Sequence, residues 1–290
     1  FYAIKELSNS KGFPTNAIYG FTSMLMKLLR DWQPAYIAVV FDLRGPTVRH
    51  ETYDQYKANR KPAPDGLVMQ IPHVKDVIRA FSIPVVEMQG VEADDIIGTL
   101  ARKYSSQGAK VVIVSGDKDL MQLVSDEIIM LDTMKEKTYD TQAVKERFGV
   151  PPEKVVEILG LMGDASDNIP GVPGIGAKGA QSLVEEYGSV EEVIKNVERI
   201  KNAKAKKAIR EHAEQARMSR DLALIRTNIS IDVSMEECRL QKPDTGALAA
   251  IFREFEFSSL IHDLKITEPV EAVCHGIHKA EELDCLLEKI

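Results

Sequence analysis

The sequence contains few cysteines and no long apolar run. Its three cysteines lie far apart and form no CxxC pair, so neither a disulfide framework nor a zinc site is expected, and a reducing cytoplasm fits best. No stretch approaches the roughly 18 continuous apolar residues of a membrane helix. The amino terminus lacks the charged start and the long apolar region of a signal peptide. These absences argue against membrane proteins and disulfide-rich secreted proteins.

The sequence also lacks an initiating methionine and a positive net charge. It begins at Phe1, and we interpret the chain as a fragment of a longer polypeptide. The formal net charge of −7 argues against a protein that simply coats nucleic acid, although bound cations would offset acids gathered in one metal site. The 290 residues are enough for one large or two modest domains, and an apolar fraction of 44% is ordinary for a globular core.

Apolar residues in the first half alternate between helical and strand spacing. Helical spacing is found over residues 18–32, 74–81 and 96–104, and short apolar runs predict strands at 36–41, 85–86, 111–114 and 128–131. Strands that alternate with helices predict a mostly parallel sheet with helices on both sides. The segment 44–67 is polar, basic and almost without periodicity, which is typical of a functional or disordered segment.

The second half has a different organisation. From about residue 141, short helical patterns joined by Gly and Pro predict a helical lobe. Residues 201–226 form a basic helical stretch, which fits a solvated face as well as a duplex contact. After Lys265 a strand at 270–274 and a helix at 279–290 indicate the start of another domain. We therefore expect an α/β domain over residues 1–140, a helical lobe over 141–266, and a linker with the start of a following domain over 267–290.

Carboxylates follow the predicted strands repeatedly, at the edge where α/β sheets bind ligands. Singly, each has an ordinary structural reading as a helix-terminal acid, an N-cap or an Asx-turn. Together they would repel one another strongly unless cations bind between them. Oxygen ligands favour Mg²⁺ or Mn²⁺, and two such ions are a standard device for phosphodiester hydrolysis. The candidate ligands are Asp42, Glu92, Asp94, Asp95, Asp117, Asp119, Asp164 and Asp167.

These motifs, in this order, resemble those of the 5′ nuclease (flap endonuclease) family. They are Val-Val-Phe-Asp42, Glu92-Ala-Asp-Asp95, Asp117-Lys-Asp119 and Gly163-Asp-Ala-Ser-Asp-Asn168. Within this family the chain is most similar to the 5′→3′ exonuclease domain of bacterial DNA polymerase I, over nearly its whole length. The resemblance implies a PIN-like α/β domain, with a mostly parallel twisted sheet and flanking helices, plus a helical lobe that contains a helix-hairpin-helix motif.

The resemblance also implies roles for individual residues. Asp42, Glu92, Asp94 and Asp117 would belong mainly to a first metal position and Asp119, Asp164 and Asp167 to a second, with Asp95 near both. The basic segment 49–60 would be the arch of the family. Within it Arg49 would contact DNA, Tyr56 would stack on a base near the cut, and Lys57 and Arg60 would hold the scissile phosphate. A solvated basic loop is the structural alternative.

A glycine-rich loop follows the acidic motifs. It fails the P-loop pattern, because Ala177 stands where the lysine is required, and it fails the dinucleotide fingerprint, because no strand precedes it. A short glycine hairpin between helices resembles a helix-hairpin-helix motif, whose backbone N–H groups suit a DNA phosphate. We expect DNA contacts from Gly174, Gly176, Lys178 and Gly179, and the resemblance implies a K⁺ ion there. The structural alternative is a tight turn between two helices.

The function implied is a two-metal, structure-selective 5′→3′ exonuclease and flap endonuclease that acts in primer removal and repair. Its partners would be DNA with a 5′ end or flap and polymerase domains in the same parent chain. We expect a monomer in the cytoplasm, associated with the bacterial nucleoid, and no membrane. The alternative is a non-catalytic DNA-junction-binding module of the same fold. Because the family has a further strand and metal-binding Asp before the segment matching Phe1, we expect the 290-residue chain to fold poorly or cleave weakly.

Overall fold

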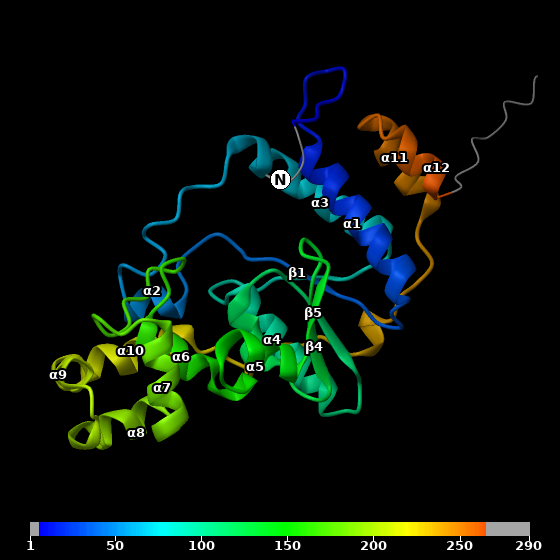
Figure 1. The fold of residues 1–290 in the computed structure, drawn as a ribbon. Helices are drawn as coiled ribbons and strands as arrows, with labels where there is room; N and C mark the ends of the chain where they lie inside the picture. The colour runs from blue at the N-terminus through cyan, green and yellow to red at the C-terminus, as the bar shows by residue number, and fades with distance from the viewer. Residues whose placement is uncertain (1–5, 265–290) are drawn as a thin grey trace, which may run out of the picture.

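The computed structural model describes residues 6–264. Figure 1 shows an α/β part on one side and a group of short helices on the other. The α/β part is built from helices α1 (Asn16–Trp32), α2 (Val48–Thr52), α3 (Asp65–Ala80) and α4 (Ala93–Ser105), strands β1 (Val39–Val40), β2 (Val85–Val86), β3 (Val111–Val114), β4 (Ile128–Asp132) and β5 (Lys137–Tyr139), and the 3₁₀ helix η1 (Lys118–Leu123).

The strands form two small sheets. In one, β1 pairs in parallel with β2; in the other, β4 pairs in parallel with β3 and antiparallel with β5. Parallel pairing is therefore present as expected, but the strand predicted over residues 36–41 is only two residues long. An apolar groove of about 630 Å³ lies between β1 and β3, with Leu25 of α1 and Ile97 of α4 also in its lining.

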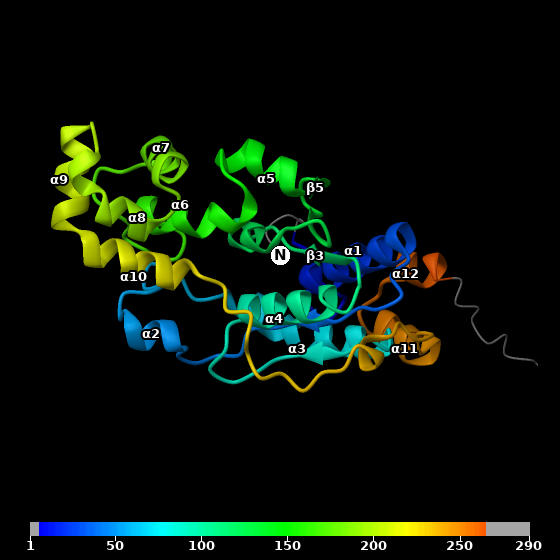
Figure 2. The same cartoon turned by 90° about the horizontal axis from the view of Figure 1, so that it is seen from below.

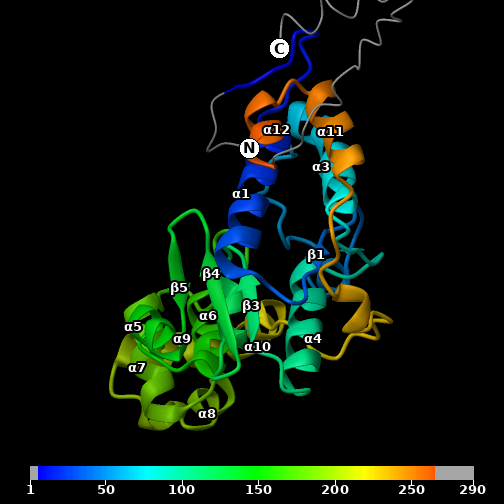
Figure 3. The same cartoon turned by 90° about the vertical axis from the view of Figure 1, so that its right-hand side faces the viewer.

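Helices cover both sides of this groove. Apolar residues at helical spacing place Ile18 and Leu25 of α1 in one core with Val77 and Ile78 of α3, and Figure 3 shows α1 and α4 on different sides of the strands. The α4 helix begins at the Glu92-Ala-Asp-Asp95 motif. Its first-turn carboxylates are favoured by the partial positive charge of a helix N-terminus, so the core packing of α4 fixes where these acids lie.

The helical lobe comprises short helices packed around α6. Its elements are α5 (Thr141–Phe148), η2 (Pro152–Lys154), α6 (Val155–Met162), α7 (Ala177–Tyr187), α8 (Val190–Lys195), η3 (Val197–Arg199), α9 (Ala203–Glu211) and α10 (Ala213–Ala223). Ile158, Leu161, Leu183 and Ile209 belong to its buried core. The basic stretch 201–226 is therefore two helices, α9 and α10, rather than one.

The chain then returns to the α/β part. After α10 it passes η4 (Glu236–Cys238), and Tyr36 and Arg239 form an antiparallel bridge. The last two helices, α11 (Thr245–Glu254) and α12 (Ser258–Asp263), contribute Leu248 and Leu260, respectively, to the core that contains α1 and α3. Figure 2 shows α11 and α12 away from the lobe. The described part of the expected lobe, residues 141–264, therefore does not pack as one unit, because the apolar faces of α11 and α12 are buried against α1 and α3.

The strand and helix expected after residue 265, and the domain boundary at 266, lie outside the described residues. Within residues 6–264, no helix has both the length and the apolar character needed to cross a membrane.

Candidate active site

Two acidic groups meet where β1 and β2 end. Asp42 follows β1, and its Oδ1 accepts a 2.7 Å hydrogen bond from the backbone N–H of Ala93 at the start of α4. Asp94 lies in the first turn of α4. Burial, and after it the charge of Asp117, raises the pKa of the Asp94 carboxyl to about 7, and Asp42 acts in the same direction. The carboxylates predicted from separate motifs are therefore close enough to repel one another.

The turn after β3 supplies the next two acids. Asp117 caps η1, because its Oδ1 accepts a 2.9 Å hydrogen bond from the backbone N–H of Asp119. This is the N-cap role that sequence reasoning kept as an alternative, and the charge of Asp117 acts on both Asp94 and Asp119. Burial raises the pKa of Asp119 to about 6, with further contributions from Asp117 and Asp164. The acidic group thus continues from α4 to η1 and toward the lobe.

Asp164 and Asp167 lie in a small hairpin, which we call the acidic loop (residues 163–169). The backbones of Asp164 and Ile169 bond to each other in both directions, at 2.9 and 2.8 Å. Gly163 adopts φ +76°, and a Cβ there would lie 2.4 Å from the carbonyl oxygen of Ile169. Asp164 Oδ1 also accepts from the backbone N–H of Ser166 at 3.0 Å, an Asx-type contact. The loop therefore requires glycine at this position in order to present its two carboxylates.

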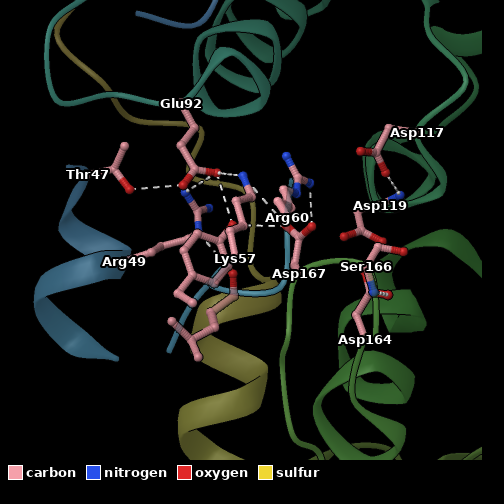
Figure 4. Close-up of polar contacts among 12 residues, drawn as sticks. Thr47, Arg49, Lys57, Arg60, Glu92, Asp117, Asp119, Asp164, Ser166 and Asp167 are labelled. Carbon is pink, nitrogen blue, oxygen red and sulfur yellow. Dashed lines mark hydrogen bonds and ion pairs between the residues drawn. The ribbon is translucent and has the colours of Figure 1, made fainter. Parts of the chain in front are cut away.

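Cationic side chains lie beside the carboxylates, and Figure 4 shows Lys57 and Arg60 near Glu92 and Asp167. Lys118 Nζ lies 2.7 Å from Asp164 Oδ2 and 3.1 Å from Asp119 Oδ1. Lys57 Nζ lies 2.9 Å from Glu92 Oε2, and Arg60 pairs with Asp167. Burial alone would raise the pKa of Asp164, but Lys118 and the N–H of Ser166 hold it below the usual value.

The carboxylates of this site are possible ligands for a divalent metal ion. Among residues 6–264, no three Asp, Glu, His or Cys side chains converge closely enough to hold an ion in the arrangement described. The available donors are nonetheless carboxylate oxygens, which Mg²⁺ and Mn²⁺ prefer. The raised pKa values of Asp94 and Asp119 show that these two carboxyls lack sufficient positive charge nearby. The donor chemistry therefore fits a divalent cation, and Lys57 and Lys118 supply only part of the charge needed.

The arch segment (residues 49–60) lies against this site instead of extending into solvent. The backbone N–H of Lys57 donates to the carbonyl of Asp167 at 2.9 Å, and Asn59 donates to the carbonyl of Ala165 at 2.7 Å. Asn168 in turn donates to the carbonyl of Gln55 at 2.6 Å. These bonds join the arch to the acidic loop and place Lys57 and Arg60 among the carboxylates.

Two arch residues are placed differently from what sequence reasoning expects. Tyr56 is 3% exposed, and its hydroxyl lies 3.1 Å from both Glu92 Oε2 and Asp167 Oδ2, so its ring cannot stack on a base in this arrangement. Burial, followed by these two carboxylates, raises the pKa of Tyr56. Arg49 is also buried, and its guanidinium pairs with Asp95. Both residues face the protein interior, and neither faces solvent where DNA would bind.

Sequence reasoning also missed contacts. Thr47 donates to Glu92 Oε1 at 2.9 Å, and Lys118 bridges the two acidic motifs. The signal for Lys118 is its place between Asp117 and Asp119, whereas no local pattern marks Thr47.

The glycine loop (residues 171–180) joins α6 to α7. Gly174 adopts φ +82°, and a Cβ at Gly174 or Gly176 would meet no heavy atom within 4 Å. Gly176 is the residue before α7, and Lys178 and Gly179 are exposed in its first turn. The loop thus presents an open backbone and a helix N-terminus, as the sequence predicts for an anion-binding turn.

Comparison with protein families gives two adjacent matches. Residues 1–149 match the model of the 5′-3′ exonuclease N-terminal resolvase-like domain, and residues 150–246 match that of the 5′-3′ exonuclease C-terminal SAM fold. Two relatives illustrate the similarity. The chain is 42% identical to DNA polymerase I of Bacillus caldotenax over 269 residues, covering 91% of this chain and 31% of the relative. It is 41% identical to a 5′-3′ exonuclease of Aquifex aeolicus over 266 residues, covering 91% and 90%.

Solved structures agree on the fold. The zinc-bound T5 5′-exonuclease aligns with a TM-score of 0.64 at 21% identity, covering 84% of this chain and 90% of that one. The catalytic core of Rad2 in complex with a DNA substrate aligns with a TM-score of 0.55 at 19% identity, covering 86% of each. The expected α/β fold with a helical lobe is confirmed. The chain spans about a third of the length of the DNA polymerase I relatives.

Proposed function

Because the chain belongs to the 5′-3′ exonuclease family, we propose that it hydrolyses DNA phosphodiesters as a structure-selective 5′→3′ exonuclease and flap endonuclease. The observation that carries this proposal is the meeting of carboxylates from three separate motifs with the basic arch. Burial and the charge of Asp117 raise the pKa of Asp94 to about 7, and Lys57 and Arg60 lie beside the same carboxylates.

The acids would hold two divalent cations, Mg²⁺ or Mn²⁺. Asp42, Asp94 and Asp117 would contribute to a first ion, because the charges of Asp117 and Asp42 both act on Asp94. Asp164, whose charge acts on Asp119, would contribute with Asp119 to a second ion, together with Asp167 of the acidic loop. When bound, such ions lower the pKa of a coordinated water and stabilise the charge of a leaving oxygen. Glu92 and Asp95 are already occupied by Lys57 and Arg49, so we assign them less direct roles in holding the ions.

The chain's own cations would bind the reacting phosphate. Lys57 and Arg60 occupy the space between the acids in the free protein, and a phosphate entering the site would compete with Glu92 and Asp167 for them. Positioned cations stabilise the negative charge that develops on a phosphate during attack. The products would carry a 5′-phosphate and a 3′-hydroxyl.

The glycine loop would hold the duplex at a distance from the cut. The exposed backbone N–H groups at the start of α7 and the ammonium group of Lys178 suit a DNA phosphate, and carbonyls of the same loop would accept a K⁺ ion. We further propose that the chain acts as a cytoplasmic monomer, within a parent polymerase that removes primers and repairs DNA. The similarity to DNA polymerase I supports this last point.

A cleavage assay on a labelled 5′-flap duplex tests the proposal. We expect products in Mg²⁺, none in EDTA, and at least a 100-fold loss of rate in the Asp117→Asn, Asp119→Asn double variant. Flap binding without cleavage by the full-length parent chain in Mg²⁺ would instead support the rival function, a non-catalytic junction-binding module. Cleavage by the double variant at the unchanged rate would exclude the acidic cluster as the catalytic site.

A further inference from the structure

The guanidinium of Arg49 joins three segments that are distant in the sequence. Arg49 belongs to α2 in the arch, and its side chain is 7% exposed. Nη1 and Nη2 donate to Asp95 Oδ2 and Oδ1, each at 2.8 Å, in a bidentate pair. Nε donates to the carbonyl of Leu222 at 2.9 Å, and Nη2 also donates to that of Leu224 at 2.7 Å. Arch, α4 and the end of α10 therefore meet at one side chain.

Both carboxylate oxygens of Asp95 take part in this contact. Each accepts from Arg49, and Oδ1 also accepts from the backbone N–H of Arg226 at 2.9 Å. Its residue is 3% exposed. The pKa of Asp94, its neighbour in sequence, is instead raised by the charges of Asp117, Asp42 and Glu92. Consecutive residues at the start of α4 thus serve different partners, because adjacent helical positions point about 100° apart.

The carbonyls that Arg49 binds lie at the end of a helix. The α10 helix ends at Ala223, and the last carbonyls of a helix have no partner within it. Side-chain cations commonly satisfy such carbonyls. Here the cation comes from the arch, about 170 residues earlier in the chain, so the end of the lobe and the base of the arch are held together.

We propose that Arg49 and Asp95 form a buried clamp that positions the arch for the reaction, and that neither residue contacts a DNA phosphate or a metal ion. This inference rests on the proposed nuclease function. The clamp fixes α2 and thereby the start of the segment that carries Lys57, whose Nζ lies 2.9 Å from Glu92. Four of the five N–H donors of the Arg49 guanidinium bond to Asp95 and to the two carbonyls, and Nη1 also lies 3.5 Å from Glu92 Oε2, so the buried guanidinium is surrounded by protein acceptors. Both oxygens of Asp95 accept hydrogen bonds, which leaves this carboxylate little capacity for an ion.

A double-mutant cycle separates the clamp from two independent ligand contacts. Arg49→Gln, Asp95→Asn and the double variant are compared in single-turnover cleavage of a 5′-flap duplex. A shared clamp predicts a loss of at least tenfold in each single variant and no further loss in the double variant. Independent phosphate and metal contacts predict that the two losses multiply, and that result would overturn the inference.

The conservative variant Arg49→Lys gives a second discrimination, measured as flap binding in EDTA over a range of salt. A lysine keeps the charge but cannot make the four bonds of the guanidinium. The clamp predicts that Arg49→Lys behaves like Arg49→Gln and that neither changes the slope of log K against log salt. A phosphate contact predicts that Arg49→Gln lowers the slope by about 0.9 and that Arg49→Lys restores it, which would contradict the clamp. Lys178→Ala serves as the positive control, with the lowered slope expected.

A third measurement detects a purely global loss of stability. In the wild-type background Lys57→Ala should lower the cleavage rate. In the Arg49→Gln background the clamp predicts no additional loss, because the arch is already displaced. Arg220→Gln is the matched control, since Arg220 forms a partly buried pair with Glu157 inside the lobe at 2.9 Å. In that background Lys57→Ala should retain its full effect. An unchanged Lys57→Ala effect in the Arg49→Gln background would refute the positioning role.

Amide exchange and metal titration test the clamp independently of cleavage. Arg49→Gln and Asp95→Asn should each speed hydrogen exchange of the backbone amides in residues 47–58 and 222–226. Exchange there at the wild-type rate would contradict the proposal. The Mg²⁺ midpoint of residual activity should be unchanged in Asp95→Asn and raised in Asp94→Asn; an equal rise in both would overturn it. If the full-length parent chain fails to cleave flaps, the proposed function fails, whereas the exchange measurements still decide the clamp.

Discussion

The charged form of the Asp94 carboxyl destabilises the folded protein when no divalent ion is bound, and the substitution Asp94→Asn removes that charge. The pKa of Asp94 is raised to about 7 by burial and by Asp117, so without divalent ions the folded state binds more protons than the unfolded state between pH 4 and 7. Stability in EDTA therefore falls as the pH rises through this window. We expect Asp94→Asn to reduce that fall and to be as stable as the wild type or more so at pH 8, measured by urea unfolding in EDTA.

The same substitution should abolish most of the activity. An amide has one oxygen and no charge to offer a cation, so we expect cleavage to fall by about 100-fold or more at saturating DNA. Asp221→Asn is a suitable control, because this exposed carboxylate of α10 pairs only with Arg220 among the described contacts. A variant of Asp94 that is both less stable in EDTA and fully active would contradict this account of the residue.

Individual side chains mark the limit of sequence reasoning. The motifs predicted Asp42, Asp94 and Asp117 at one edge, because the carboxyl ends of strands and the starts of following helices share an edge. In the structure the charges of Asp42 and Asp117 act on Asp94. Tyr56 and Arg49 were expected to face DNA, yet both are buried. Tyr56 bonds to Glu92 and Asp167, and Arg49 to Asp95 and Leu222, so each has one partner more than 30 and one more than 100 residues away. The local sequence around Tyr56 and Arg49 contains no pattern that indicates such distant contacts. Residue type and position alone therefore predicted that both side chains would be exposed.

At the scale of elements, two glycines near the site should respond differently to alanine. In the acidic loop, Gly163→Ala would place a Cβ 2.4 Å from the carbonyl of Ile169 at a positive φ. We expect a loss of about 2 kcal/mol or more in unfolding free energy, together with reduced cleavage. In the glycine loop, Gly176 has an ordinary φ and open space around its Cβ position. Gly176→Ala should change stability by less than about 0.5 kcal/mol and weaken DNA binding. Equal stability losses in the two variants would contradict this assignment.

The β4–β5 turn offers a pH-dependent test outside the site. Asp132 accepts from the backbone N–H groups of Met134 and Lys135 at 3.1 Å each, and from Lys135 Nζ at 2.6 Å. The Lys135 side-chain bond is the largest cause that lowers the pKa of Asp132. Its stabilising effect is therefore present above the unfolded pKa of about 4 and is lost as the pH falls through the lower folded value.

Asp132→Asn should test that turn without affecting the nuclease chemistry. The amide keeps one acceptor but loses the ion pair with an exposed lysine, so we expect a loss of about 0.5–1 kcal/mol at pH 7. The difference from the wild type should shrink at pH 3, measured by denaturant unfolding. A difference that grows toward acidic pH would show that another group controls this turn.

Element types were predicted better than element lengths. The helices α1, α3 and α4 match their apolar periodicity, and β3 and β4 match their continuous apolar runs. The strand expected over residues 36–41 pairs with β2 only at Val39 and Val40. The α2 helix was missed, because its five residues are too few to show a period. Hydrogen-bonded partners and tertiary contacts set these lengths, and periodicity does not encode them.

For the whole molecule, the motif order was the most informative signal in the sequence. The family resemblance read from that order is confirmed by matches that cover residues 1–246. The return of α11 and α12 to the α1–α3 core was not foreseen. Their amphipathic pattern requires an apolar partner but does not identify which of two cores provides it, so a continuous helical lobe was the simpler expectation.

The distribution of charge in the molecule predicts how substitutions should change its affinity for flap DNA when no metal ion is bound. The formal net charge is −7, and the acids around Asp117 and Asp119 lie where the phosphate must approach. Charges within a Debye length of about 10 Å act on a bound phosphate, and more distant ones are largely screened at 0.1 M salt. We therefore expect the Asp117→Asn, Asp119→Asn variant to bind flap DNA more tightly than the wild type in EDTA, although it cannot cleave it.

A matched pair of substitutions tests whether location or net charge is responsible. Glu236→Gln with Glu237→Gln changes the net charge by the same two units near Tyr104, at the far end of α4 from Asp94. Ten helical residues separate these ends by about 15 Å, which exceeds the screening length. This control should leave flap affinity in EDTA unchanged, measured by fluorescence anisotropy. An equal gain in affinity in both variants would mean that DNA senses only the total charge, and the acidic cluster would then not lie on the path of the phosphate.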